Sequence, residues 1–281
     1  MKKNRRNFIK LSGLAGISLA GNNILGSMFS SDLPLDHQPM KKEFPNMTPE
    51  SEFTPNLIGP YGDWAAGLTQ KSLPSLSFRK KEFTDPEQWR KNAKKRLEDR
   101  LAIPDIGKAL EVIKIKEYTY DGLHIEELKW QLPYGRPTEA ILLKPESATG
   151  KLPAILAFHD HGGNKYFGTR KITRTGPQHP LMVTHQQEYY EGRAWANEIA
   201  KRGYVVLVSD AFPFASRRVM MQDVPVSQRN GLTDENPEDP KNIEAYNKWA
   251  GEHEHVMAKS LFSAGTTWPG VFLAEDMKAL D

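Results

Sequence analysis

The residue types best suited to chemistry lie in one short segment: His159, Asp160, His161, Gly162 and Gly163. The segment follows an apolar run at 153–158, which is typical of a strand covered on both faces. Catalytic groups of open α/β sheets gather where such strands end, and glycines let the backbone approach a bound molecule closely. Backbone N–H groups there can stabilise the oxyanion of acyl transfer, where one lost donor costs roughly 2.7–4 kcal/mol of barrier. We interpret 159–163 as an oxyanion loop, with a plain strand-to-loop turn as the alternative.

The same segment also permits a metal site. His159 and His161 form an H-x-H pair, Asp210 follows the next predicted strand, and a second pair, His253 and His255, lies downstream. Imidazole and carboxylate groups suit zinc or iron, and a metal-bound water can act as a nucleophile. Residues two apart lie about 200° apart on a helix, so an H-x-H pair binds one ion only where the backbone turns both rings to one point. A metal-dependent hydrolase therefore remains the alternative.

No serine of this chain has the surroundings expected of a nucleophile. The sequence has no G-x-S-x-G motif, in which the serine lies on a sharp strand-to-helix turn. Ser18 matches half of the pattern within the N-terminal leader, and Ser263 follows a predicted helix and lacks the leading glycine. We therefore expect that a Ser-acid-His triad cannot be assembled from these residues. Asp210 follows the next strand and is expected to brace neighbouring loops, including the loop at 159–163. Arg217 and Arg218 lie further along and could hold Asp210 or a substrate, but a solvent-exposed pair is the favoured interpretation.

The elements that position these groups can be predicted from periodicity and from turn residues. Alternating and apolar runs predict strands at 112–118, 124–132, 138–144, 153–158 and 204–209. Capping residues and i, i+4 spacing predict helices at 85–103, 189–202, 239–262 and 269–280. A strand, a helix and a strand between 153 and 209 imply a right-handed parallel crossover. We expect an α/β fold: an antiparallel entry block that leads into a mostly parallel sheet.

Residues 1–31 have the order of an export signal. Paired Arg5 and Arg6 precede an aromatic residue, a lysine and an apolar stretch at 11–25. This order is typical of a twin-arginine signal. The stretch contains three glycines and is too short for a stable membrane span, which needs about 20 apolar residues. We expect export to the periplasm or the exterior by the twin-arginine machinery, with a basic amphipathic helix as the alternative.

Composition bounds the remaining possibilities. Residues 1–10 hold five of the 38 basic residues, and the rest of the chain has 33 basic against 35 acidic residues, so nothing suggests a nucleic-acid partner. The chain has no cysteine, which excludes disulfides, thiolate metal sites and a cysteine nucleophile. Seven prolines within 32–84 predict an extended arm. The expected domains are therefore a signal at 1–31, an arm at 32–84 and a folded core at 85–281.

A family resemblance is carried by several short segments: Trp89, 156–165, 190–197, 202–206, 210–213, 216–218 and 268–270. Together they resemble secreted bacterial α/β-hydrolases of the acetyl xylan esterase-like and dienelactone hydrolase-like group. Similar proteins continue past the helix at 268–270 into a strand, a G-x-S-x-G turn, an acid loop and a final histidine. The resemblance therefore implies the N-terminal part of an α/β-hydrolase fold, incomplete at the C-terminus, and an oxyanion role for the loop at 159–163.

The expected function is that of an exported serine esterase that removes acetyl groups from sugars or hydrolyses small esters, without a cofactor. In the intact enzyme a serine would attack the ester carbonyl, and a histidine would shuttle the proton. This chain alone is expected to be an inactive fragment without the nucleophile. Besides the metal-dependent hydrolase, a non-catalytic exported binding protein of hydrolase ancestry remains an alternative.

Overall fold

The computed structural model describes residues 57–68, 73–108 and 111–281. The chain divides into two units, Met1–Thr69 and Gln70–Asp281. In the first unit the described residues form one short helix, α2 (Tyr61–Gly67), within the segment predicted as an extended arm. The predicted signal at 1–31 lies outside the described residues, so the domain bounds stay a prediction. Among the described helices, none has both the length and the hydrophobicity needed to cross a membrane.

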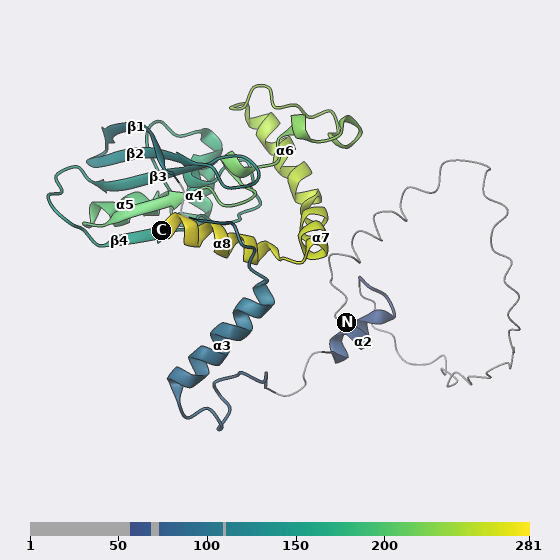
Figure 1. Cartoon of the computed structure of the whole chain (residues 1–281). Helices are drawn as coiled ribbons and strands as arrows, with labels where there is room; N and C mark the ends of the chain where they lie inside the picture. Colours follow the sequence, from purple (N-terminus) through teal and green to yellow (C-terminus); the bar gives the residue numbers. More distant parts are fainter. Residues whose placement is uncertain (1–56, 69–72, 109–110) are drawn as a thin grey trace, which may run out of the picture. The chain divides into compact units, whose positions relative to one another are not determined.

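Five strands of the second unit form one sheet in the order β1-β2-β3-β5-β4 (Figure 1). They are β1 (Ile113–Tyr120), β2 (Leu123–Trp130), β3 (Thr138–Pro145), β4 (Ala154–Ala157) and β5 (Val205–Ser209). Each lies within a few residues of its predicted range. β4 and β5 pair in parallel, as the strand-helix-strand pattern predicted, and the other three pairings are antiparallel. The described strands thus form an α/β fold in which the expected parallel character is limited to one pair.

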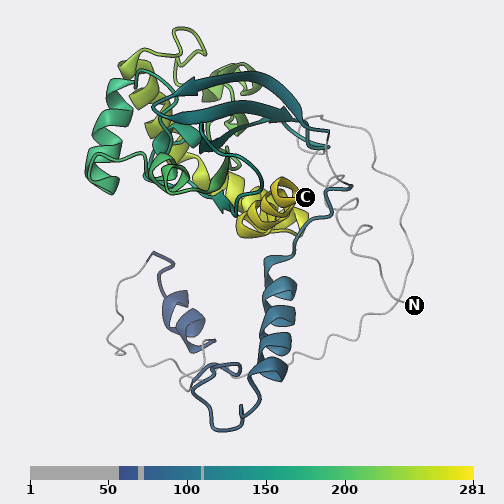
Figure 2. The same ribbon diagram turned by 90° about the vertical axis from the view of Figure 1, so that its left-hand side faces the viewer.

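Apolar side chains alternate between the two faces of this sheet. Val206 and Val208 of β5 belong to a core cluster with α5 (Trp195–Lys201), whose Ala196 and Ala200 are fully buried. Leu207 points to the other face and packs in a second cluster that includes Ala274 of α8 (Trp268–Leu280). Helices therefore cover both faces, and α8 lies on one side of the strands in Figure 2. Burial on both faces explains why β5 is apolar throughout.

The predicted helix at 189–202 is confirmed only in its second half. The chain forms α4 (Pro180–Tyr190), which begins at the N-cap His179, and the separate helix α5 over 195–201. Glu191 and Gly192 have φ values of 54° and 76°, a left-handed conformation that ends α4. The prediction joined the end of α4 to α5 because the spacing of the apolar residues gives no sign of this turn.

The remaining helices agree with their predicted positions. α3 (Pro86–Leu101) begins at Asp85, whose side chain accepts hydrogen bonds from the N–H groups of Glu87 and Gln88. The predicted helix at 239–262 is two helices, α6 (Pro240–Glu252) and α7 (Glu254–Ala264), which meet at His253. Short 3₁₀ turns lie between β5 and α6, at Ala215–Arg217, Met221–Asp223 and Val226–Gln228. The end of α3 meets the start of α8, because Thr266 and Thr267 donate to the carbonyls of Ala102 and Leu101.

Candidate functional site

The predicted oxyanion loop leaves β4 at the sheet edge where β5 also ends, and a cavity of about 210 Å³ adjoins it. The cavity is lined by Phe158, His159, Asp160, His161, Ser209, Ala211, Phe214, Phe272 and Asp276. These residues come from the ends of the two parallel strands and from α8. The structure thus brings three of the five predicted loop residues to one cavity at the sheet edge expected for chemistry.

Several backbone N–H groups of the loop are available as donors. Within the described part of the chain, the N–H groups of His159, Asp160, His161 and Gly162 take part in no hydrogen bond, whereas that of Gly163 donates to Nδ1 of His161 at 3.1 Å. Gly162 and Gly163 have φ values of 45° and 62°. Successive N–H groups in such turns make concave sites that suit an anion. The donors that the loop can offer therefore include the successive N–H groups of His161 and Gly162, and Gly163 is not one of them.

The His159 ring is a fixed part of the wall of this cavity. Its Nε2 accepts from the N–H of Ala211 at 3.1 Å, so the proton lies on Nδ1, which donates to the carbonyl of Asp160 at 3.0 Å. Burial, helped by repulsion from Lys171, lowers the pKa of His159 to about 4. The ring is therefore neutral near pH 7, and both nitrogens are already engaged with the backbone.

The Asp160 carboxylate anchors the loop to two side chains of α4. Its Oδ2 accepts from Nε2 of His185 at 3.2 Å and from the Tyr190 hydroxyl at 2.5 Å. Burial opposes ionisation, but these two hydrogen bonds hold the pKa of the Asp160 carboxyl well below its usual range. A Cβ on Gly162 would lie 2.3 Å from Oδ1 of Asp160 and 2.6 Å from Cε1 of His185. Only glycine fits at position 162, for steric as well as conformational reasons.

The His161 side chain points to a different set of partners. Its Nε2 lies 2.7 Å from Oε1 of Glu254 on α7 and 3.0 Å from Nζ of Lys165, and Lys165 also forms an ion pair with Glu254. Burial opposes ionisation of Glu254, but Lys165 lowers its pKa. This group borders a second, larger cavity of about 700 Å³, which is lined largely by apolar and aromatic side chains of α6, α7 and the 213–228 stretch.

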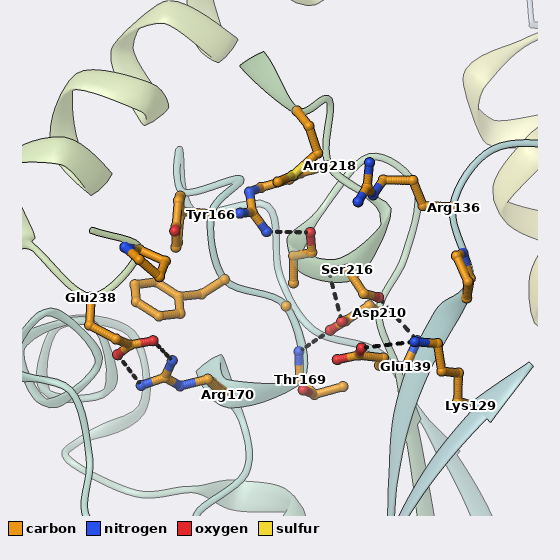
Figure 3. Close-up of a pocket in the computed structure, with 16 residues that line it drawn as sticks. Lys129, Arg136, Glu139, Tyr166, Thr169, Arg170, Asp210, Ser216, Arg218 and Glu238 are labelled. Atoms are coloured by element: carbon orange, nitrogen blue, oxygen red, sulfur yellow. Dashed lines mark hydrogen bonds and ion pairs between the residues drawn. The ribbon is translucent and has the colours of Figure 1, made fainter. Parts of the chain in front are cut away.

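The Asp210 carboxylate holds two loop segments, at Thr169 and Ser216. The carboxylate accepts from the N–H of Thr169 at 2.8 Å and from that of Ser216 at 3.1 Å, and burial raises its pKa. Figure 3 shows these contacts in the wall of a further cavity of about 360 Å³. A Cβ on Gly168 would lie 2.2 Å from Oδ1 of Asp210, so the loop packs directly on the carboxylate.

Arg217 is buried, whereas the sequence favoured a solvent-exposed pair of Arg217 and Arg218. Its guanidinium does not contact Asp210 but forms a buried ion pair with Glu275 of α8 at 2.8 Å, and Glu275 also accepts from the Tyr134 hydroxyl at 2.7 Å. The Arg217 and Glu275 side chains are only 1% and 8% exposed. Arg217 therefore ties the turn after β5 to α8 and to the segment before β3.

The residues of the metal alternative are not assembled into a ligand set. In the described ranges no group of three His, Asp or Glu side chains lies close enough to hold a metal ion. The ring nitrogens of His159 are bound to backbone groups, and Asp210 is bound to two N–H groups. His253 donates from Nδ1 to the carbonyl of Trp249, at 2.7 Å.

Three residues that support the loop were not predicted: Lys171, His185 and Tyr190. His185 belongs to α4, most of which was not predicted, and Tyr190 was noted only as part of the predicted helix at 189–202 and of the family resemblance. Lys171 lies among Arg170 and two threonines, a polar surrounding that gives no hint of burial, yet its side chain is completely buried. Only the tertiary structure brings these groups under 159–163.

Comparison with known proteins supports the fold. No family model matches this chain, and no curated protein matches it either. The chain superimposes with a TM-score of 0.54 and 18% identity on a Bacteroides fragilis protein provisionally assigned as an acetyl xylan esterase, covering 81% of this chain and 52% of that one. The chain therefore spans about half the length of this structure. At such low identity the likeness concerns the fold, which is esterase-like, and function must be argued from the site.

Two further solved structures show weaker likeness. A methylesterase matches with a TM-score of 0.31 and 15% identity over 60% of this chain and 31% of its own. Acetyl xylan esterase 1 from Thermoanaerobacterium sp. JW/SL YS485 matches with a TM-score of 0.24 and 14% identity over 62% and 46%.

Proposed function

We propose that this chain supplies the oxyanion-binding half of a carboxylic ester hydrolase that acts on acylated sugars or small esters. The observation that carries the proposal is the pair of unengaged N–H groups of His161 and Gly162, in a loop at the carboxyl end of a parallel strand beside a cavity. An ester carbonyl oxygen at these donors would gain negative charge as the tetrahedral intermediate forms, and the two donors would stabilise it.

The proposal assigns no nucleophile within residues 1–281. Hydrolysis by this route needs an activated serine, and no G-x-S-x-G turn is present in the sequence. The serine, its acid and its histidine are proposed to come from chain beyond these residues, which fits the match to about half of the esterase-like structure. The 281-residue chain by itself is then expected not to hydrolyse p-nitrophenyl acetate.

A pair of substitutions at position 161 tests the donor role. In the protein expressed from its complete reading frame, His161→Pro removes the backbone N–H, whereas His161→Ala removes only the side chain. If the N–H stabilises the oxyanion, His161→Pro lowers kcat for p-nitrophenyl acetate roughly 100- to 1,000-fold relative to His161→Ala. Circular dichroism and urea unfolding check that both variants are folded. Equal kcat values in the two variants, or no hydrolysis by the unsubstituted protein, would contradict the proposal.

The same proposal includes export before the enzyme acts. It is supported by Arg5, Arg6 and the apolar stretch at 11–25, all outside the described residues. Replacing both arginines by lysine keeps the charge but removes the paired guanidinium groups. The double variant is expected to accumulate in the cytoplasm, as measured by cell fractionation. Unchanged export of the double variant would argue against a twin-arginine route.

A further inference from the structure

The Lys171 ammonium lies beneath the candidate oxyanion loop with no exposed surface. It donates to the carbonyl oxygens of Asp160 at 2.8 Å and of His161 at 2.9 Å, and it lies 4.5 Å from the centre of the Phe214 ring. A buried ammonium normally has a carboxylate as its nearest partner. Here the Asp160 carboxylate is 4.0 Å away, and the closest contacts are two carbonyls of the loop.

These two carbonyls belong to the peptide groups that carry the unengaged N–H groups of His161 and Gly162. The carbonyl of Asp160 shares a peptide plane with the N–H of His161, and the carbonyl of His161 shares one with the N–H of Gly162. In a trans peptide the C=O and N–H bonds point in opposite directions. Because Lys171 binds both oxygens, it turns both N–H groups away from itself. A charge-assisted hydrogen bond to a carbonyl also polarises the peptide group and makes its N–H a stronger donor.

We propose that Lys171 is the positioning residue of the oxyanion site, because its ammonium fixes and polarises the two peptide groups that donate to the substrate. The inference rests on the proposed esterase function, and it adds a residue that never touches the substrate. Two other hydrogen bonds hold the same carbonyls: His159 donates to Asp160, and the N–H of Asn164 donates to His161 at 3.2 Å. The loop can therefore remain folded without the ammonium, while the direction and strength of its donors change.

One test measures the NMR signal of the His161 carbonyl and does not depend on catalysis. His161-Gly162 is the one His-Gly pair in this sequence, so the 281-residue chain labelled with carbonyl-¹³C histidine and ¹⁵N glycine has one coupled carbonyl signal, that of His161. Burial lowers the pKa of Lys171 to about 8, so raising the pH from 7 to 9.5 should remove the proton and shift this signal. In Lys171→Met the same titration should leave the signal unchanged. A wild-type signal that does not move, or one that moves equally in Lys171→Met, would overturn the proposal.

The charged and titratable groups around Lys171 are Asp160, Lys165, Asp210 and His159. Asp160 has a pKa well below its usual range, so it stays charged between pH 7 and 9.5 and keeps the same effect throughout. The pKa of His159 is about 4, so its ring stays neutral. Lys165 is present in the wild type and in the Lys171→Met variant. Any effect of Lys165 on the carbonyl signal would therefore appear in both titrations.

A kinetic test uses the protein expressed from its complete reading frame. Lys171→Met should lower kcat for p-nitrophenyl acetate about tenfold or more with little change in KM, because oxyanion donors act in the transition state. Lys201→Met is the matched control. It removes a lysine of α5 that pairs with Asp121, far along the chain from the loop, and should keep the wild-type kcat. Equal kcat values for wild type and Lys171→Met would overturn the inference and leave the esterase proposal intact.

Chemical rescue separates the charge from a packing effect. The chain has no cysteine, so Lys171→Cys introduces a unique thiol. Alkylation of the unfolded variant with 2-bromoethylamine, followed by refolding, restores an ammonium at nearly the length of lysine. The restored protein should regain both kcat and the titrating carbonyl signal, whereas iodoacetamide treatment should not. Equal recovery with both reagents would overturn the proposed role of the charge. If the unsubstituted protein hydrolyses no ester, the carbonyl titration still decides whether Lys171 controls the peptide groups.

Discussion

His159 and Asp276 line the same cavity, and burial moves both groups toward their neutral forms. It lowers the pKa of the His159 imidazole to about 4, and together with Glu275 it raises the pKa of the Asp276 carboxyl to about 6. Between these two values neither group is predominantly charged. Their effects on stability are opposite, because acid protonates His159 only in the unfolded chain, whereas it protonates Asp276 first in the folded one.

Replacing His159 should reduce the acid sensitivity of the protein. As the pH falls from 6.5 towards 4, the unfolded chain gains a proton on His159 and the folded chain does not, so wild-type stability falls. His159→Gln should remove this share of the pH dependence, about 2 kcal/mol between pH 7 and pH 5. Urea unfolding at both pH values measures it. His255→Gln, at an exposed histidine of α7, is the control and should retain the wild-type pH dependence.

Replacing Asp276 should change the pH dependence of stability in the opposite direction. Its folded pKa is raised, so the ionised carboxylate destabilises the protein above pH 6, and protonation relieves this cost as the pH falls towards 4. Asp276→Asn should therefore be more stable than wild type at pH 8, with the difference narrowing between pH 6 and pH 4. Thermal unfolding across this range checks the prediction. A variant less stable than wild type at pH 8 would show that the carboxylate has a stabilising partner.

For single residues, the sequence indicated where the site lies but not which side chains support it. A glycine pair after an apolar run was enough to place the loop at 159–163. The role of Lys171 could not be predicted from the sequence, because whether a lysine is buried depends on which carbonyls the fold brings near it. The burial of Arg217 could not be predicted for the same reason, since its partner Glu275 is 58 residues further along the chain.

Helix α8 is held at its first turn by a single threonine. Oγ1 of Thr267 accepts from the N–H of Gly270 at 3.0 Å and donates to the carbonyl of Leu101 at 2.7 Å, so one hydroxyl caps α8 and ties it to the end of α3. Thr267→Ala should destabilise the protein by about 1–2 kcal/mol. Thr267→Ser keeps the hydroxyl and should stay close to wild type. Urea unfolding compares the three proteins, and equal losses in both variants would point to the methyl group instead.

Element positions were predictable where local signals and tertiary structure agree. Asp85 before a proline marked the start of α3, and the apolar run at 204–209 marked β5. The prediction of one helix over 189–202 was correct only for 195–201, because Glu191 adopts a left-handed conformation that is rare for residues other than glycine. The parallel pairing of β4 with β5 followed from the intervening helical pattern, whereas the position of β5 between β3 and β4 could not be read from local sequence.

In the described sheet, the two outer strands are protected to different degrees. β1 alternates isoleucine with Lys114 and Lys116, and such charges discourage pairing with another chain. β4 reads Ala-Ile-Leu-Ala without a charge, pairs only with β5 among the described strands, and is followed by Phe158, which is 54% exposed. We therefore expect the 281-residue chain to self-associate through β4.

A charge on β4 should suppress this association. Ala154 is exposed and lies at the end of β4 remote from the loop, so Ala154→Lys adds a charge without touching the site. Light scattering over a concentration series should show larger species for wild type than for Ala154→Lys. Ala258→Lys adds the same charge at an exposed position of α7 and should behave like wild type. If both lysine variants reduce association equally, net charge rather than the strand edge is the cause.

The dependence of the loop on Lys171 bears on protein engineering. A designer who grafted residues 159–163 onto another parallel sheet would copy the glycines but leave behind the cation that orients their neighbours. Water would then bind the two carbonyls, and the peptide planes would be free to rotate. A functional graft also needs a lysine on a separate turn and an aromatic ring, such as that of Phe214, next to its ammonium. The unit that must be transferred is therefore discontinuous in sequence.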